Sequence, residues 1–174
     1  MHGSEGTDST LLVTAIAQLC LDADSRTIRG FQALIEREWI QAGHPFFLRC
    51  AHSAYATGAI TGPHESPTFL CFLDCVWQLT RQYPSCFEFN EQLLLFLFEH
   101  AYASEFGSFL GASEAEKARW RVRELTVSLW SYVNHPEVLK SFVNALYEPY
   151  DEVLWPSVAP QSIVRGWWRA VRVG

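Results

Sequence analysis

The residues best suited to chemistry lie at the start of the chain, in the sequence H-G-S-E-G-T-D-S-T of residues 2–10. Two glycines separate small polar and acidic side chains there, and an apolar stretch over residues 11–21 follows directly. A glycine-rich loop that leads into a buried helix presents unpaired backbone N–H groups and the positive end of the helix dipole to whatever occupies the loop. We therefore predict a loop shaped to hold an anion.

In cysteine phosphatases a loop of this kind carries a Cys-x5-Arg motif. The helix end lowers the pKa of the cysteine, so that its thiolate attacks phosphorus. The arginine holds two phosphate oxygens at once and stabilises the transition state. Here the loop resembles that of the myotubularin family of lipid phosphatases, H-C-S-D-G-W-D-R-T. The matching positions are His2, Ser4, Gly6, Asp8 and Thr10, with Glu5 a close substitute, whereas Gly3, Thr7 and Ser9 replace the cysteine, the tryptophan and the arginine.

The resemblance extends well beyond the loop. The stretch S-R-T-I-R-G-F-Q-A-L-I-E-R-E-W-I-Q-A-G-H-P-F over residues 25–46 looks like a family signature. So do S-P-T-F-L-C-F-L-D-C-V-W-Q-L over residues 66–79 and F-E-F-N-E over residues 87–91. The resemblance covers residues 1–162 and points to the inactive branch of the family, in which the same glycine and serine replacements occur.

The physical consequence of the two replacements can be stated from the residues alone. Gly3 has no nucleophilic atom, and Ser9 offers one hydroxyl where arginine offers a cationic fork. Glu5 and Asp8 would leave the loop mouth acidic with no balancing charge. Ser4 is not expected to act as a substitute nucleophile, because a neighbouring His2 does not by itself make a catalytic triad. We predict a vestigial phosphate loop, residues 2–10, with no catalytic residue.

The expected fold class is mainly α. The resemblance implies the C-terminal helical part of an α/β phosphatase domain, inactive, over residues 1–162, followed by a divergent tail over residues 163–174. It also implies that the chain starts at the phosphate loop and lacks most of the sheet. Family members carry a lipid-binding domain further upstream and a coiled coil that pairs subunits downstream, and neither is expected among these residues.

The function implied by the resemblance is that of a pseudophosphatase, which regulates active myotubularins that act on phosphoinositides phosphorylated at the 3-position. Active myotubularins are the expected partners, although the coiled coil that pairs family subunits is absent here, and peripheral contact with phosphoinositide membranes is a further expectation. Two alternatives stay open. One is an active phosphatidylinositol 3-phosphate phosphatase, and the other is a helical interaction fragment without a regulatory role.

Composition sets limits that agree with this interpretation. The chain has 174 residues, of which 49% are hydrophobic and 18% charged, as in a globular domain. Its net charge of −6 argues against nucleic acid as the main ligand. Five cysteines, an odd number, favour free thiols in a reducing, cytoplasmic setting, with peripheral association with endomembranes as an extension. No apolar run reaches the roughly 18–20 residues of a membrane span, and no cofactor or metal is expected.

Helical periodicity and end signals recur along the chain. Gly43 is placed to stop one helix, Ser66 with Pro67 to start another, Asn90 to cap a third, and Ser113 with Glu116 to form a capping box. The predicted helices cover residues 11–21, which we expect to be buried all round, part of 31–42, 66–82, 90–103, 114–124 and 127–133, with one more after residue 136. Residues 1–10, 54–63 and 148–160 are predicted to be irregular.

Two cysteine patterns invite a functional interpretation and do not support one. Cys20 and Arg26 match Cys-x5-Arg, but there is no glycine between them and the thiol sits at the negative end of a helix. We expect a buried thiol and an exposed arginine there. Cys71 and Cys75 share a helix face, and we expect core packing, because His44, Cys50 and His52 do not complete a zinc spacing.

Two further features have plain structural explanations. His44 follows a helix stop and precedes a proline, so we interpret it as a turn residue. The run R-W-R-V-R over residues 119–123 could contact lipid headgroups or an acidic partner. A solvated helix face is favoured, with the arginines paired to Glu114, Glu116 and Glu124.

Overall fold

The computed structural model describes residues 6–50, 66–103, 106–111 and 113–159. Over these residues the chain is helical, and its only β pairing in the described part is one antiparallel bridge between Phe89 and Val143. The elements, in chain order, are α1 Ser9–Leu21, the 3-10 turn η1 Asp24–Arg26, α2 Ile28–Ile35, its π-helical continuation η2 Glu36–Gln41, α3 Phe46–Arg49, α4 Thr68–Gln82, α5 Glu91–Tyr102, the 3-10 turn η3 Gly107–Phe109, α6 Glu114–Arg119, α7 Val122–Leu125, α8 Leu129–Val133 and α9 Pro136–Phe142. The prediction of a mainly helical chain is confirmed.

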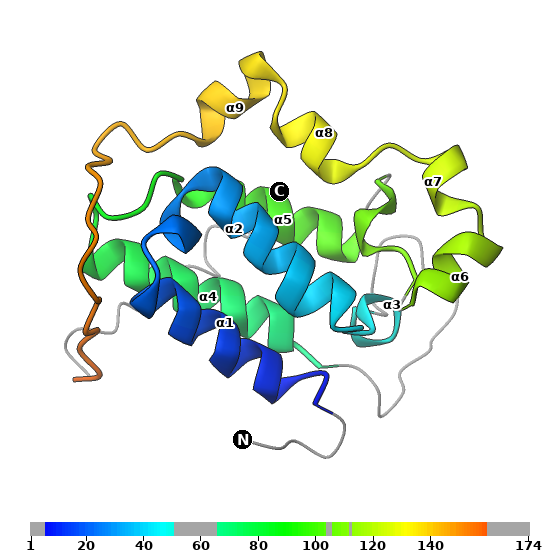
Figure 1. The fold of residues 1–174 in the computed structure, drawn as a ribbon, viewed down its shortest axis with the longest axis horizontal. Coiled ribbons are helices and arrows are strands. Elements are labelled where there is room, and N and C mark those ends of the chain that lie inside the picture. Colours follow the sequence, from blue (N-terminus) through cyan, green and yellow to red (C-terminus); the bar gives the residue numbers. More distant parts are fainter. Residues whose placement is uncertain (1–5, 51–65, 104–105, 112, 160–174) are drawn as a thin grey trace.

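The body of the fold is formed by α1, α2, α4 and α5, which lie side by side in Figure 1. Helix α4 packs against both α1 and α5, and α1 also touches η2. The short helices α6–α9 follow one another along one edge, and residues 143–159 then run past the opposite end of the helices as an extended strap. Each long helix therefore has an apolar face to bury against a neighbour.

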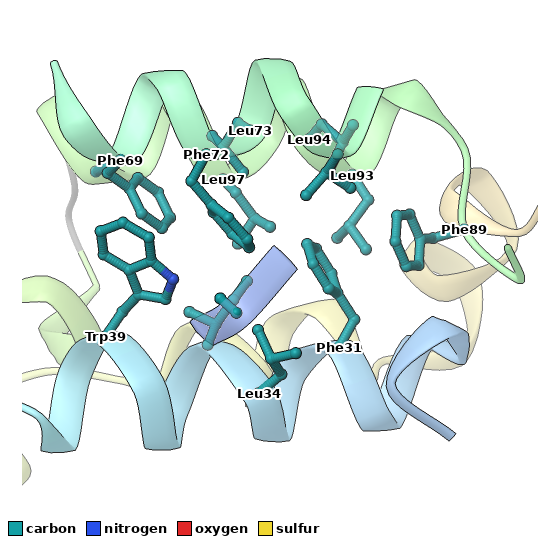
Figure 2. Close-up of a cluster of buried hydrophobic side chains, with 14 of the residues drawn as sticks. Phe31, Leu34, Trp39, Phe69, Phe72, Leu73, Phe89, Leu93, Leu94 and Leu97 are labelled. Atoms are coloured by element: carbon teal, nitrogen blue, oxygen red, sulfur yellow. The ribbon is translucent and has the colours of Figure 1, made fainter. Parts of the chain in front are cut away.

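An aromatic core lies between α2 and the α4–α5 pair (Figure 2). Phe31 stacks on Phe89 with ring centroids 4.3 Å apart, and Trp39 meets both Phe69 and Phe72 at 5.0 Å. These rings are fully or almost fully buried. Aromatic pairs at such distances contribute roughly 0.5–1.5 kcal/mol each beyond their area burial, so this layer adds to the stability that the buried apolar residues supply.

Local signals explain where several helices begin. Thr27 accepts a hydrogen bond from the Gly30 N–H, and Asn90 accepts one from the Gln92 N–H. Ser113 accepts from the Glu116 N–H at 3.2 Å. Each side chain satisfies a backbone donor that the helix itself leaves unpaired. The predicted caps at residues 90 and 113 are confirmed, and Gly43 ends η2 in the left-handed region with φ 82°.

Helix α1 begins at Ser9 and so takes in two residues that were predicted to be loop. The prediction that it is buried all round was wrong. It buries one face through Leu11, Ala15 and Leu19, whereas Val13 is 40% exposed and Leu21 63% exposed. The reason is its place at the edge of the bundle, where α4 and η2 cover only one side.

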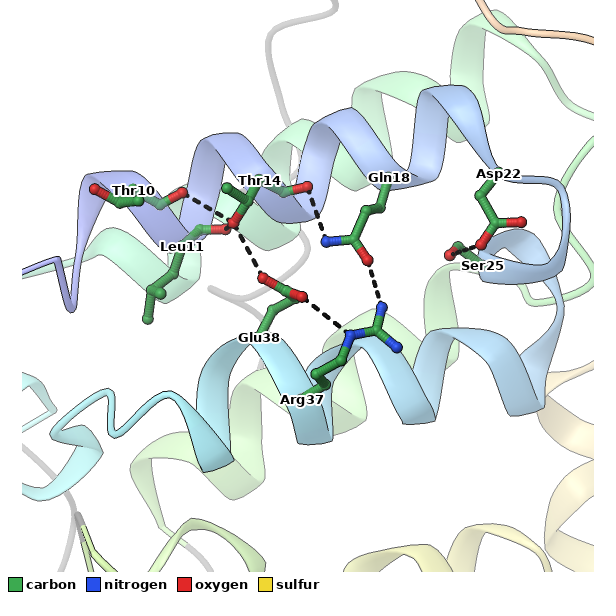
Figure 3. A network of polar contacts seen from close by, with 8 residues as sticks. All are labelled: Thr10, Leu11, Thr14, Gln18, Asp22, Ser25, Arg37 and Glu38. Atoms are coloured by element: carbon green, nitrogen blue, oxygen red, sulfur yellow. Dashed lines mark hydrogen bonds and ion pairs between the residues drawn. The ribbon is translucent and has the colours of Figure 1, made fainter. Parts of the chain in front are cut away.

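A network of polar side chains ties that edge helix to η2 (Figure 3). The Thr14 hydroxyl donates to Glu38 at 3.2 Å, Arg37 Nε donates to Glu38 at 3.1 Å, and Arg37 also donates to Gln18. Burial opposes ionisation of Glu38, but hydrogen bonds from Gln18, Arg37 and Thr14 outweigh it and lower the pKa of this carboxyl.

Two other boundaries differ from the predictions. The expected helix over residues 114–124 is split into α6 and α7, because Arg121 adopts a left-handed conformation with φ 54°. Helix α4 begins at Thr68, with Pro67 as its flanking residue and the Ser66 hydroxyl 2.6 Å from that of Thr68. The helices ending at 82, 102 and 133 agree with the predicted ones to within a residue or two, and the last helix, predicted after residue 136 without an end, is α9. Residues 143–159 are irregular, as expected from residue 148 onward. The predicted loop at 54–63 lies outside the described residues.

Candidate functional site

The structure describes the second half of the predicted phosphate loop. His2, Gly3, Ser4 and Glu5 lie outside the described residues. Gly6 has φ 69°, a left-handed conformation that favours glycine. Thr7 and Asp8 then lead into α1, where Ser9 and Thr10 form the first turn. The loop therefore meets the N-terminus of a 13-residue helix, as the sequence predicted, and Ser9 is exposed at the point where α1 begins.

An ion pair holds the loop at Asp8. Arg49, the last residue of α3, donates from Nε to Oδ1 at 3.1 Å and from Nη2 to Oδ2 at 2.5 Å. The Arg49 side chain is 15% exposed and that of Asp8 32% exposed. Two parallel bonds between a guanidinium and a carboxylate fix orientation as well as distance. Asp8 makes no side-chain bond to cap its own helix, because its carboxylate is engaged by Arg49.

His44 supports the loop from the core side. Its Nδ1 lies 2.7 Å from the Thr7 carbonyl oxygen and 3.4 Å from Asp8 Oδ1. Burial lowers the pKa of His44 and outweighs the bond to Thr7 and the Asp8 charge, which act in the opposite direction. The neutral ring therefore carries its proton on Nδ1 and donates it to the carbonyl. Nε2 is buried with no hydrogen-bond partner among the described residues.

Aromatic rings fix the orientation of that imidazole. Trp39 meets it edge-on with centroids 5.0 Å apart, and Phe46 does so at 4.7 Å. The His44 side chain is fully buried between them and the loop. The loop is thus connected to the aromatic core, because the His44 ring that bonds Thr7 packs against Trp39 and Phe46.

These contacts correct two sequence-based interpretations. Asp8 is not an unbalanced acid, because Arg49 neutralises it. His44 does follow the Gly43 stop, but it is a loop support rather than only a turn residue. Sequence reasoning missed Arg49, since it lies 41 positions from Asp8 and no local pattern links the two. The short helix that ends at Arg49 was not predicted either, and its sequence gives no signal of the arginine's partner.

The chemistry open to the described half-loop is limited. Residues 6–10 contain no thiol, and Ser9 supplies a hydroxyl at the start of the helix. The nearest identified cation, Arg49, is committed to Asp8. Cys50 follows it in sequence but is buried, which raises the pKa of its thiol to about 12 and leaves it protonated at neutral pH. Backbone N–H groups at the helix end remain the means of holding an anion.

The second Cys-x5-Arg pattern is structural. Burial raises the pKa of the half-buried Cys20 thiol against the pull of Arg26, and the thiol lies at the end of α1, as expected. The arginine was expected to be exposed, and that was wrong. Arg26 is 1% exposed, and it donates to the carbonyls of Tyr150 at 2.8 Å and Glu152 at 2.9 Å. Its role is to anchor the strap.

Other candidates also resolve into structural roles. Cys71 is exposed, so core packing was wrong for it, while Cys75 is half-buried. No cluster in the described part of the chain has the ligands for a metal ion. Two of the three arginines in the run 119–123 are paired as predicted, Arg121 with Glu124 and Arg123 with Glu114. No described helix has the length and apolar character needed to cross a bilayer.

Comparison with known proteins now defines the class. A family model described as the myotubularin-like phosphatase domain matches residues 1–118. The match includes the loop, its Arg49 and His44 supports, and α1 through α5. The chain belongs to the myotubularin family.

Individual relatives place it more finely within that family. The chain is 62% identical to myotubularin-related protein 9 of Caenorhabditis elegans over 163 residues, which are 94% of this chain and 29% of that protein. It is 60% identical to myotubularin-related protein 9 of Homo sapiens over the same shares. It is 45% identical to the phosphatidylinositol-3,5-bisphosphate 3-phosphatase MTMR2 of Mus musculus over 90% of this chain and 24% of that protein. The chain spans less than a third of the length of these relatives.

Proposed function

We propose that this chain is a catalytically inactive myotubularin-like pseudophosphatase that regulates active members of the family. One observation carries the proposal: the loop has Gly3 and Ser9 where the resemblance calls for the cysteine nucleophile and the phosphate-binding arginine. The proposed vestigial site is residues 2–10, within a pseudophosphatase segment over residues 1–162 and with the divergent tail 163–174 outside it.

The first support is chemical. Removing a covalent nucleophile typically costs about 10⁴–10⁶ in kcat. Loss of the arginine removes the cation that stabilises charge on the transferring phosphoryl group. Arg49 does not substitute for it, because its guanidinium is already bonded to both carboxylate oxygens of Asp8.

The second support is that loop architecture and loop chemistry are carried by different residues. Asp8, His44 and Arg49 hold the described half of the loop, and neither Gly3 nor Ser9 contributes to those contacts. The contacts that hold the described half of the loop therefore do not depend on the reactive groups. A folded surface without turnover is what a regulator of related enzymes requires.

A hybrid enzyme tests inactivity without depending on the rest of the domain. The matching 157-residue stretch of the mouse 3-phosphatase relative is replaced by that of this chain, which is 45% identical to it. Phosphate release is then measured on vesicles that contain phosphatidylinositol 3-phosphate. We expect no turnover above the vesicle background, and we expect Gly3→Cys with Ser9→Arg to restore it.

The outcomes separate the alternatives. Turnover by the hybrid with its native loop, abolished by Ser4→Ala, would establish an active phosphatase and end the pseudophosphatase proposal. Restoration by the double substitution would show that the two missing groups are the whole deficit. Single substitutions serve as the matched controls, because either group alone should leave the rate near background.

Regulation is tested separately, with the chain as it stands. The tagged 174-residue chain is used to capture purified active myotubularins, and their phosphate release is measured with and without it. We expect association and a change in rate. An absence of both would leave a helical interaction fragment, and deletion of residues 1–10 would then alter nothing that can be measured.

A further inference from the structure

The strap, residues 143–159, is extended chain that is nonetheless pinned along its whole length. Asn144 Nδ2 donates to the carbonyls of Pro84 and Phe87 at 2.8 and 2.9 Å. The Leu154 N–H donates to the Cys20 carbonyl at 2.9 Å. Further along, Gln82 and Ser157 exchange two bonds of 3.1 and 2.8 Å. With the two bonds from Arg26 already described, the strap is fixed to the ends of α1 and α4 and to the chain after α4.

Such pinning gives the strap two distinct faces. Leu154 points inward and is 2% exposed. Its neighbours on either side point outward, as successive residues of extended chain do: Val153 is 38% exposed and Trp155 82% exposed. Val158 is 85% exposed, and Leu21, next to the Cys20 carbonyl that Leu154 bonds, is 63% exposed. A held tryptophan amid exposed aliphatic side chains is typical of a docking surface.

The charge of this surface has one sign. The strap contains no lysine or arginine. Glu148, Asp151 and Glu152 are exposed on it, and Asp22 and Asp24 are exposed on the adjoining turn. Burial is the largest of the causes that raise the pKa of the Tyr147 phenol, and the charges of Asp24 and Asp151 raise it further. The two carboxylates therefore both lie near Tyr147. The cation held by the strap, Arg26, is buried beneath it.

We propose that residues 163–174 dock on this strap face within the same chain. Their sequence is I-V-R-G-W-W-R-A-V-R-V-G, with three arginines, two tryptophans and no acidic residue anywhere in 160–174. Indole and aliphatic side chains match the exposed apolar residues of the strap, and guanidinium groups match its carboxylates. The inference does not rest on the pseudophosphatase proposal.

Chain length permits the docking. Position 163 lies four residues beyond position 159, a span of at most about 14 Å, and the twelve residues from 163 onward reach about 40 Å when extended. The part of the strap from residue 146 to residue 158 is a non-helical run of 13 residues. A segment that turns back can therefore cover the strap from one end to the other.

Limited proteolysis of the intact 174-residue chain tests the proposal. Trypsin cleaves after Arg165, Arg169 and Arg172, and cleavage proceeds through the undocked state. The test variant combines Glu148→Gln, Asp151→Asn and Trp155→Ala, positions at which no hydrogen bond of the folded body is broken. We expect cleavage at the three arginines to be at least about tenfold faster in this variant than in the parent chain, which is about 1.4 kcal/mol of docking. Cleavage after Arg123, exposed and remote, serves as the internal reference.

The matched control likewise neutralises two carboxylates and removes one tryptophan elsewhere, with Glu99→Gln, Glu137→Gln and Trp120→Ala, all at exposed residues. Its cleavage rates should equal those of the parent. Equal rates in the parent and the strap variant would overturn the proposal. Protection that strengthens with protein concentration would also overturn it, because the strap would then be covered by a second copy. Circular dichroism of both variants confirms that the helices persist.

Discussion

The aromatic core and the loop clamp solve the same problem by opposite means. Each joins parts of the chain that are far apart in sequence. The core does so with many neutral contacts, in which Phe31, Trp39 and Phe72 each touch several other rings. The clamp does so with a few polar contacts, between Arg49 and Asp8 and between His44 and the Thr7 carbonyl. A substitution in the core removes packing and leaves a cavity, whereas a substitution in the clamp leaves a polar or charged group without its partner.

The difference bears on how an enzyme fold can lose its chemistry. The core and the clamp both lie outside positions 3 and 9, where the reactive groups of the family are replaced. The contacts described for both are made by other residues. The residues that hold the loop are different from the residues that would have reacted in it. The following substitutions test the contacts that hold the fold and the loop.

The largest effect is expected in the core. Trp39→Ala removes a fully buried ring that contacts His44, Phe69 and Phe72. Lost burial together with the cavity should lower the free energy of unfolding by about 3–5 kcal/mol. Urea titration followed by circular dichroism measures it. Trp120→Ala, at a tryptophan that is 46% exposed, is the control and should cost less than about 0.5 kcal/mol. Similar losses for the two would contradict the assignment of the core.

The clamp should respond more weakly but more locally. Arg49→Ala leaves Asp8 without its partner in a site where both side chains are largely covered, and we expect a loss of about 1–3 kcal/mol. Hydrogen exchange at the first turn of α1 should accelerate more than exchange in α5. Arg121→Ala, which breaks an exposed pair, is the control and should cost under about 1 kcal/mol.

A double-mutant cycle sharpens the assignment. If the bond between Asp8 and Arg49 carries the effect, adding Asp8→Asn to Arg49→Ala should cost little more than Arg49→Ala alone. Additive losses would mean that the two residues act through separate contacts, and the clamp would not exist as a unit. Arg49→Lys should retain only part of the stability, because an ammonium group cannot form both parallel bonds.

Acid should weaken the same clamp through His44. Its pKa is lowered in the folded chain, so the unfolded chain takes up the proton first. Above about pH 6.5 both states are neutral and the effect vanishes. As pH falls below that value the fold loses stability, until the folded pKa is also passed. The stability of the parent chain minus that of His44→Gln, measured by urea titration from pH 8 to pH 5, should therefore decrease. A flat difference would show that His44 is not held neutral.

Sequence reasoning recovered most of the helices because their signals are local. The caps at Asn90 and Ser113 and the stop at Gly43 each act within a few residues. It failed where the outcome depends on distant neighbours. Arg26 was expected at the surface, since nothing near it in sequence indicates the two strap carbonyls that it meets 124 and 126 positions later. Arg49 was missed for the same reason, and α1 was judged fully buried because its periodicity cannot reveal that it lies at an edge.

The smallest effect is expected at that edge, where a polar network replaces packing. Glu38→Gln removes a carboxylate that accepts from Thr14 and Arg37, in a side chain that is 20% exposed. A loss of about 0.3–1 kcal/mol is expected for so accessible a group. Because the folded pKa of Glu38 is lowered, its contribution is present above the ordinary value of about 4.5 and disappears as pH falls through the folded pKa.

Parent and variant should therefore differ at pH 7 and become more alike as pH falls below about 4.5, when their urea midpoints are compared. Glu137→Gln, at an exposed pair with Lys140 on α9, is the matched control. A difference that does not shrink on acidification would mean that Glu38 stabilises the edge by packing rather than by charge. In that case α1 would be held by packing, as the aromatic core is. The contrast between apolar packing and polar contacts would then apply only to the clamp at Asp8.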